Sequence, residues 1–212
     1  MARTILLTCG EVSPSPLLTH PRTGSRVQGL DIYALDTVEL QAYAGVLIST
    51  YADQRFLAAV RPKLERFLQS GGTVVFCGHV AYPFLPELAP FVPLTGRSVE
   101  DYRVWRVREH PVFAGVQTED LTFRKGVAGF YGRGYNPPPP HALVLHRLGT
   151  VEGAPVDCVY GRPDGGRVLV HAGNDLWGYV ADTTSASRLA PQLLDWIESS
   201  ECADEIGKEA ER

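Results

Sequence analysis

The sequence predicts an α/β domain with a mainly parallel central sheet, and three observations support this prediction. Short apolar runs recur along the chain and end at glycine or polar residues, as buried strands do. Between two of these runs, residues 45–49 and 73–77, lies a segment with helical periodicity, and strand, helix and strand in this order indicate a parallel crossover. The second half holds shorter runs separated by glycine and proline, which predict additional short antiparallel strands.

The first half contains four predicted strands, three in clear apolar runs and one weaker, with one long helix between the last two. Residues 4–9 are expected to form a buried strand, 11–28 a loop with at most one short turn, 30–34 a weak strand, and 37–43 a short helix capped by Asp36. Residues 45–49 and 73–77 are expected to be strands. The helix between them opens at Ala52-Asp53 and ends at Gly71-Gly72. Its core-facing stripe comprises Phe56, Leu57, Val60, Leu64, Phe67 and Leu68.

The second half is expected to hold shorter strands and one closing helix. Residues 102–108 alternate like an edge strand, and the short runs 121–123, 127–131, 142–148 and 155–160 are strand candidates. The prolines of 137–140 form a stiff connector, and 166–171 is a strong strand. The closing helix spans 183–199, with Leu189, Leu193, Trp196 and Ile197 facing inward. We therefore expect one domain over residues 1–200, followed by a charged, dispensable tail over 201–212 that frays.

Composition excludes several classes of protein. The net charge of -4 gives no basis for binding nucleic acid or an anionic membrane. No apolar run approaches the ~20 residues of a membrane-spanning helix, and the N-terminal residues indicate a strand rather than a signal peptide. The four cysteines lie far apart, without a Cys-x-x-Cys pair. This spacing argues against disulfides and zinc knuckles and predicts a cytoplasmic protein.

Four segments, in this order, resemble the class I glutamine-amidotransferase-like superfamily, in its trehalose-utilisation (ThuA-like) and cytoplasmic-protein branches. The first runs from Gly45-Val-Leu-Ile-Ser-Thr through Phe67-Leu-Gln-Ser-Gly-Gly-Thr-Val-Val-Phe-Cys-Gly-His. The others are Leu85-Pro-Glu-Leu-Ala-Pro-Phe-Val-Pro-Leu, His110-Pro-Val-Phe-Ala-Gly-Val and Gly165-Gly-Arg-Val-Leu-Val-His-Ala-Gly-Asn-Asp-Leu-Trp. The resemblance spans residues 45–197 and implies a flavodoxin-like, three-layer α/β domain.

The same comparison implies that the chain is not a working amidotransferase. Such enzymes present a nucleophilic cysteine on a sharp strand-to-helix turn, completed by histidine and glutamate, because the thiol needs a base. Here Cys77 follows Val-Val-Phe, so no Gly-x-Cys-x-Gly turn is formed, and no His-x-Glu pair occurs near the C-terminus. ThuA-like proteins often carry histidine where this chain has Asn174, which weakens any inherited histidine or metal chemistry.

Ligands of parallel sheets bind outside the carboxyl ends of the strands, and that rule selects a candidate site. Glu11, His79 and Asp175 follow predicted strands and are the candidate catalytic residues, with Glu11 expected to raise the pKa of His79. Tyr51, Asn174 and Trp177 are the candidate ligand-binding residues, the two aromatic rings by stacking on a sugar ring. Loop capping by His79, turn formation by Asn174-Asp175 and core packing by Trp177 are the structural alternatives.

Two functions remain open from the sequence. One is an enzyme that acts by acid/base chemistry on a small sugar-like or polyol substrate, and the other is a non-catalytic domain that binds a ligand or forms a homo-oligomer. Zinc requires three or four converging ligands, which only His79, His171, Glu11 and Asp175 could supply. No metal and no cofactor is predicted, and the expected partner is a small molecule.

Overall fold

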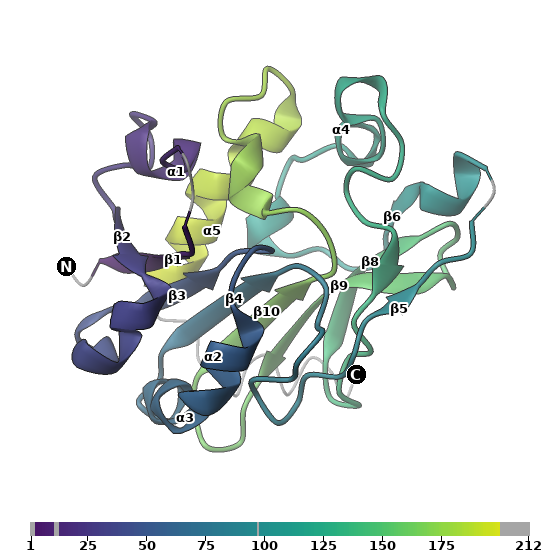
Figure 1. The fold of residues 1–212 in the computed structure, drawn as a ribbon. Helices are drawn as coiled ribbons and strands as arrows, with labels where there is room; N and C mark the ends of the chain where they lie inside the picture. Colours follow the sequence, from purple (N-terminus) through teal and green to yellow (C-terminus); the bar gives the residue numbers. More distant parts are fainter. Residues whose placement is uncertain (1–2, 11–12, 97, 200–212) are drawn as a thin grey trace.

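An eight-stranded sheet forms the centre of the protein in the computed structural model, which describes residues 3–10, 13–96 and 98–199 (Figure 1). The strand order is β2-β1-β3-β4-β10-β9-β8-β6. The first five of these strands run parallel, and β9, β8 and β6 continue the sheet in antiparallel pairs. A second sheet pairs β5 with β7. The predicted flavodoxin-like α/β class, with antiparallel strands in the second half, is confirmed.

The ten strands have the following bounds, in chain order. They are β1 (Thr4–Thr8), β2 (Val27–Asp31), β3 (Gly45–Ile48), β4 (Thr73–Cys77), β5 (Val92–Pro93), β6 (Val104–Arg106), β7 (Gly134–Tyr135), β8 (Leu143–Leu148), β9 (Ala154–Gly161) and β10 (Arg167–His171).

The helices are short, and several are single 3₁₀ turns. The α-helices are α1 (Pro16–Thr19), α2 (Gln54–Ala59), α3 (Arg61–Gln69), α4 (Thr118–Thr122) and α5 (Leu189–Glu198). The 3₁₀ helices are η1 (Ile32–Thr37), η2 (Leu40–Ala42), η3 (Glu100–Tyr102), η4 (Pro111–Phe113), η5 (Arg124–Gly126), η6 (Leu176–Tyr179) and η7 (Ser185–Arg188). No helix within the described residues has the length and apolar character needed to cross a membrane.

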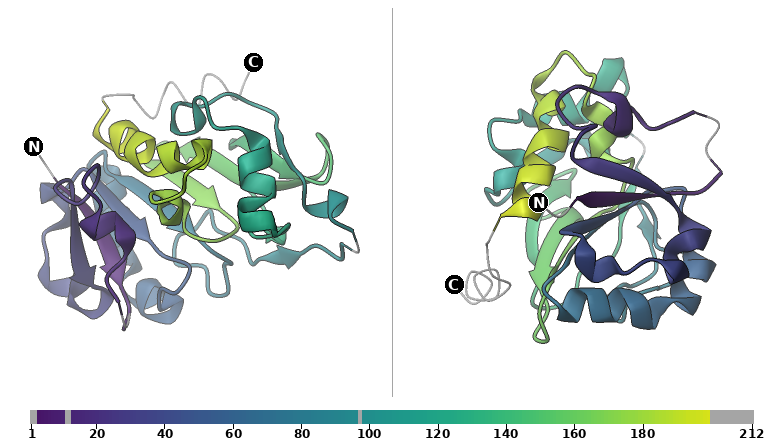
Figure 2. Two further views of the ribbon diagram at one scale, coloured as in Figure 1. Left: turned by 90° about the horizontal axis from the view of Figure 1, so that it is seen from above. Right: turned by 90° about the vertical axis from the view of Figure 1, so that its left-hand side faces the viewer.

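Both faces of the central sheet carry core residues, because alternate residues of each strand point to opposite sides and helices cover both sides. On one face, Leu6, Leu47, Val75 and Leu169 pack into a core that includes α5, η4 and η6. On the other face, neighbouring strand residues such as Val74 pack against α2, α3 and the 3₁₀ turns that follow β2. Figures 1 and 2 show α5 on one side of the sheet and the α2–α3 pair on the other. This arrangement gives the three layers that the resemblance implied.

The long predicted helix is interrupted, although its start and end are confirmed. Asp53 caps α2 by accepting hydrogen bonds from the N–H groups of Arg55 and Phe56. The helix breaks at Val60 because Pro62, in the first turn of α3, has no N–H to continue the helical ladder. Gly71 then ends α3 with a positive φ of 90°.

Four predicted elements differ from the structure. The second strand covers 27–31 rather than 30–34, because Asp31 ends it and caps η1 by accepting from the N–H of Tyr33. Within residues 37–43 only the short 3₁₀ helix η2 forms, and it follows Glu39 rather than being capped by Asp36. Residues 121–123 belong to the end of α4 rather than to a strand, and residues 127–131 are irregular, since apolar runs this short do not distinguish helix from strand.

The closing helix starts later than predicted, but its inward face is confirmed. Residues 185–188 form the 3₁₀ turn η7, and α5 begins at Leu189. Leu189, Leu193, Trp196 and Ile197 are all at most 3% exposed. The predicted tail over 201–212 lies outside the described residues, so its expected fraying remains a prediction.

Candidate functional site

The parallel strands β1, β3, β4 and β10 end at one edge of the sheet, and a pocket opens there. Thr50 follows β3, His79 follows β4, and Gly173 and Asn174 follow β10. The opposite wall comes from the segment before β7, which the sequence analysis did not assign to the site. The pocket holds about 220 Å³ and is lined by Thr50, His79, Gly129, Phe130, Gly132, Arg133, Gly173 and Asn174.

The outer wall is fixed to the sheet by backbone pairing and by amide side chains. Gly132 and Gly173 form an isolated antiparallel bridge, and the Asn174 side chain donates a hydrogen bond of 2.8 Å to the carbonyl of Phe130. Deeper in the fold, the buried Asn136 accepts from the N–H of Val80 and donates to the carbonyl of Gly78. The pocket is therefore built from segments far apart in sequence, which no local pattern could have brought together.

His79 lies at this pocket with a free imidazole. The ring stacks on Phe91 with centroids 3.6 Å apart, and among the described residues it forms no hydrogen bond or ion pair. Partial burial lowers the pKa of this ring below 6.5, and the nearby His171 lowers it further. The rise in pKa that Glu11 is expected to cause remains a prediction, because Glu11 lies outside the described residues. A neutral imidazole of this kind accepts a proton or a hydrogen bond at neutral pH.

Apart from Asn174, the other predicted site residues that the structure describes do not line this pocket. Asp175 accepts hydrogen bonds from the Ser49 hydroxyl (2.8 Å) and the Thr50 N–H (2.9 Å), so it ties the loop after β10 to the end of β3. Tyr51 is 72% exposed, whereas Trp177 is 1% exposed and belongs to the hydrophobic core. Glu11 lies outside the described residues.

Cys77 is enclosed rather than presented to solvent. It ends β4, is fully buried, and its pKa is raised, first by burial and then by the charge of Asp175. A buried thiol with a raised pKa remains protonated and unreactive at neutral pH. This environment agrees with the sequence-based argument that Cys77 is not a presented nucleophile.

A row of polar side chains, buried except for the half-buried Arg106, crosses the sheet beneath this edge, and the sequence analysis missed most of it. Arg106, His146, Asp157 and His171 are successive register partners on β6, β8, β9 and β10, and Cys77 on β4 is the partner of His171. A charged residue inside the apolar run Val156-Asp-Cys-Val159 was the available signal, because a buried carboxylate requires partners. Which side chains become the partners of this carboxylate depends on how the strands pair, which the sequence alone does not show.

Asp157 is the centre of this polar row. Its carboxylate contacts Nδ1 of His171 at 2.6 Å, Nδ1 of His146 at 2.9 Å, and the Tyr131 hydroxyl at 2.5 Å. Burial alone would raise the pKa of Asp157, but His171 and His146 outweigh that effect and lower it. Asp157 is therefore held as a carboxylate.

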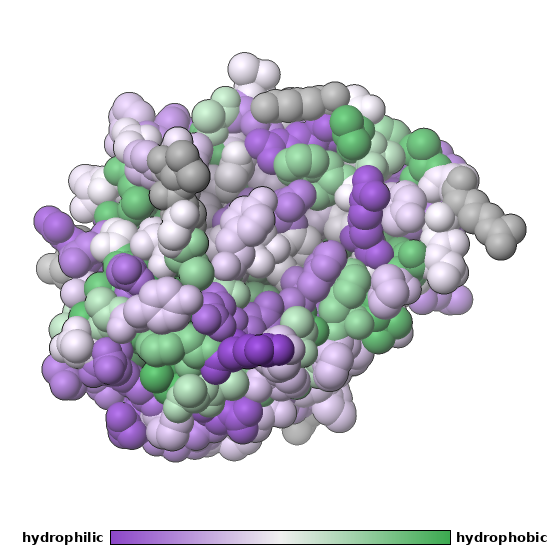
Figure 3. Space-filling view, viewed as in Figure 1, coloured by the Kyte–Doolittle hydropathy of each residue, from purple (hydrophilic) through white to green (hydrophobic). Residues whose placement is uncertain are grey.

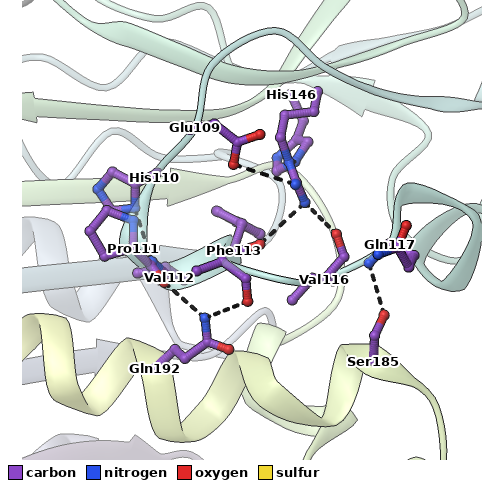
Figure 4. Close-up of polar contacts among 12 residues, drawn as sticks. Glu109, His110, Pro111, Val112, Phe113, Val116, Gln117, His146, Ser185 and Gln192 are labelled. Carbon is purple, nitrogen blue, oxygen red and sulfur yellow. Dashed lines mark hydrogen bonds and ion pairs between the residues drawn. The ribbon is translucent and has the colours of Figure 1, made fainter.

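The turn that follows β6 lies at the other end of the row, and Figure 4 shows the polar contacts around this turn. His110 Nδ1 accepts from the N–H of Val112, and Gln192 of α5 donates to the carbonyls of Pro111 and Ala114. Arg106 donates to the carbonyls of Phe113 and Val116 and to Nε2 of His146. The predicted structural role of the His-Pro turn agrees with this geometry.

Within residues 3–10, 13–96 and 98–199, no three histidine, cysteine, aspartate or glutamate side chains cluster so that they could hold a metal ion.

Figure 3 shows hydrophilic and hydrophobic residues interspersed over the face that Figure 1 presents.

No protein-family model matches this chain, and no curated protein matches it. Solved structures do share its fold. A cytoplasmic protein of Salmonella typhimurium, STM3548, superposes with a TM-score of 0.61 at 15% identity, covering 92% of this chain and 98% of that one. STM1381 from S. typhimurium LT2 gives 0.54 at 11% identity, with coverages of 92% and 100%. A protein described as ThuA-like, from Bacteroides uniformis, gives 0.48 at 13% identity, covering 94% and 92%. At such identities the likeness to the two Salmonella proteins shows a common fold.

Proposed function

We propose that this chain is a ThuA-like domain that binds a small hydroxylated molecule of the sugar or polyol class in the His79 pocket. In this proposal His79 serves as the general base toward the bound molecule. The observation that carries it is a neutral imidazole, free of partners among the described residues, beside a polar pocket. A general base must be unprotonated and within reach of the proton that it accepts, and His79 meets the first condition at neutral pH.

The size and lining of the pocket support a small, polar ligand. Its 220 Å³ is below the range of about 300–1,000 Å³ that is usual for drug-sized ligands. The hydroxyl of Thr50, the amide of Asn174 and the guanidinium of Arg133 supply donors and acceptors for hydroxyl groups. Phe130 adds an apolar surface that suits the carbon face of a sugar ring.

The proposal excludes glutamine hydrolysis, and we expect no ammonia release from glutamine. The thiol of Cys77 is buried and its pKa is raised, so the thiolate that attacks glutamine does not form. The measurement compares ammonia release by the natural chain with that by Cys77→Ala. Release clearly above the variant would contradict this part of the proposal.

A non-catalytic binding domain is the second candidate. It is favoured by the absence, among the described residues, of a carboxylate bonded to the His79 imidazole, since catalytic histidines are usually oriented by such a group. Both candidates require the pocket to bind a ligand. They differ in whether the bound molecule is chemically changed.

His79→Ala is expected to abolish binding of the ligand while leaving the thermal unfolding midpoint nearly unchanged, because the side chain is exposed. Calorimetry with glycerol, sorbitol and glucose measures binding, and proton NMR of the same mixtures detects any product. His141→Ala is the matched control, since His141 is also exposed but does not line the pocket. Binding without product favours the non-catalytic function, and unchanged affinity in His79→Ala rejects the proposed site.

A further inference from the structure

The polar row and the pocket meet at the end of β10. His171 is the last residue of that strand, and Gly173, two residues later, lines the pocket. Gly173 has no side chain, and the position that a Cβ atom would take there lies 2.6 Å from Nε2 of His171. The residue against which this nitrogen packs is therefore itself part of the pocket wall.

Hydrogen bonds determine which nitrogen atoms of the row carry protons. Arg106 has only donors, so Nε2 of His146 accepts and its Nδ1–H donates to Asp157. Asp157 is held as a carboxylate, so Nδ1–H of His171 donates to it as well, at 2.6 Å. When the His171 ring is neutral, its lone pair therefore lies on Nε2.

That Nε2 atom is buried and has no hydrogen-bond partner among the described residues. Nδ1 of the same ring, in contrast, is hydrogen-bonded to Asp157. Both ring nitrogens of His146 also have hydrogen-bond partners. An unpartnered buried acceptor costs free energy unless a partner arrives at some stage of function. His79 and Gly173 line the same pocket, and Nε2 of His171 lies against Gly173.

We propose that Nε2 of His171 is a second ligand-binding group of the pocket and accepts a hydrogen bond from a hydroxyl of the bound molecule beside Gly173. Asp157 is the positioning residue, because it fixes the tautomer and the orientation of the ring. This inference rests on the proposed function and extends it: the ligand presents two hydroxyl groups, one to His79 and one to His171. Polyols and sugars, which carry several hydroxyl groups, have that chemistry.

The test uses the full chain with ¹⁵N-labelled histidine, titrated with glycerol, sorbitol and glucose. We expect the Nε2 resonance of His171 and a ring resonance of His79 to shift together and saturate at the same concentration, while His141 stays unchanged. A shift of His79 without one of His171 overturns this inference and leaves the proposed function standing. If neither histidine shifts with any of the three compounds, both are rejected.

His171→Gln provides a second measurement if the variant folds, as checked by circular dichroism. Loss of a hydrogen bond to the ligand is expected to weaken binding about tenfold. His146→Gln is the matched control, because His146 is equally buried and bonded to Asp157 but does not contact Gly173. Equal weakening in both variants would mean that the row acts only through stability, and the proposal would then fail.

Discussion

Asp157→Asn is expected to lower the free energy of unfolding by about 3–5 kcal/mol, the usual range when one partner of a buried ion pair is removed. The carboxylate is fully buried and accepts from His146, His171 and Tyr131. An asparagine keeps the shape, but its amide nitrogen faces one of these donors and leaves it without an acceptor. Urea denaturation measures the loss.

Asp164→Asn is the matched control for this change. Asp164 also has a lowered pKa, of about 2, because Arg162 donates hydrogen bonds to it, but its side chain is 38% exposed. Solvent screens such a pair, so its removal should cost less than about 1 kcal/mol. Equal losses in the two variants would show that burial does not determine the contribution of Asp157.

The protein is expected to lose about 3 kcal/mol of stability through His110 as the pH falls from 6.5 to 4. Burial has the largest effect, and together with Arg167 and His146 it lowers the pKa of His110 to about 4, while Asp157 opposes this shift. Because the folded pKa is depressed, the unfolded chain binds a proton in this window and the folded chain does not. Stability is therefore complete above pH 6.5 and declines on acidification.

His110→Asn tests this expectation, because asparagine before proline can still accept from the N–H of Val112 but does not titrate. Unfolding free energies of the two proteins at pH 7 and pH 4 give the contribution of His110 by difference. His79 has a lowered pKa in both proteins, and Asp157 stays ionised over this range, so their effects cancel. Parallel pH curves for the natural chain and the variant would disprove the assignment to His110.

Asp175 illustrates where sequence reasoning about the site was incomplete. Its position after a predicted strand correctly indicated the edge of the sheet where the pocket lies. The hydrogen bonds from Ser49 and Thr50 make it a structural tie, so Asp175 is engaged in the fold and not only in a pocket. Sequence position identifies the edge, but it does not distinguish a side chain that faces a ligand from one that fastens two loops.

The sequence by itself determined the parallel strands β1, β3, β4 and β10, the start and end of the helical segment between β3 and β4, and the inward face of α5, because local periodicity records burial directly. It also located His79 and Asn174 at the strand ends. Only the tertiary structure decided the opposite wall of the pocket, between Gly129 and Arg133, and the alignment of His146, Asp157 and His171 across three strands. These depend on register and loop placement, which are set by contacts between residues distant in sequence, and no local pattern encodes such contacts.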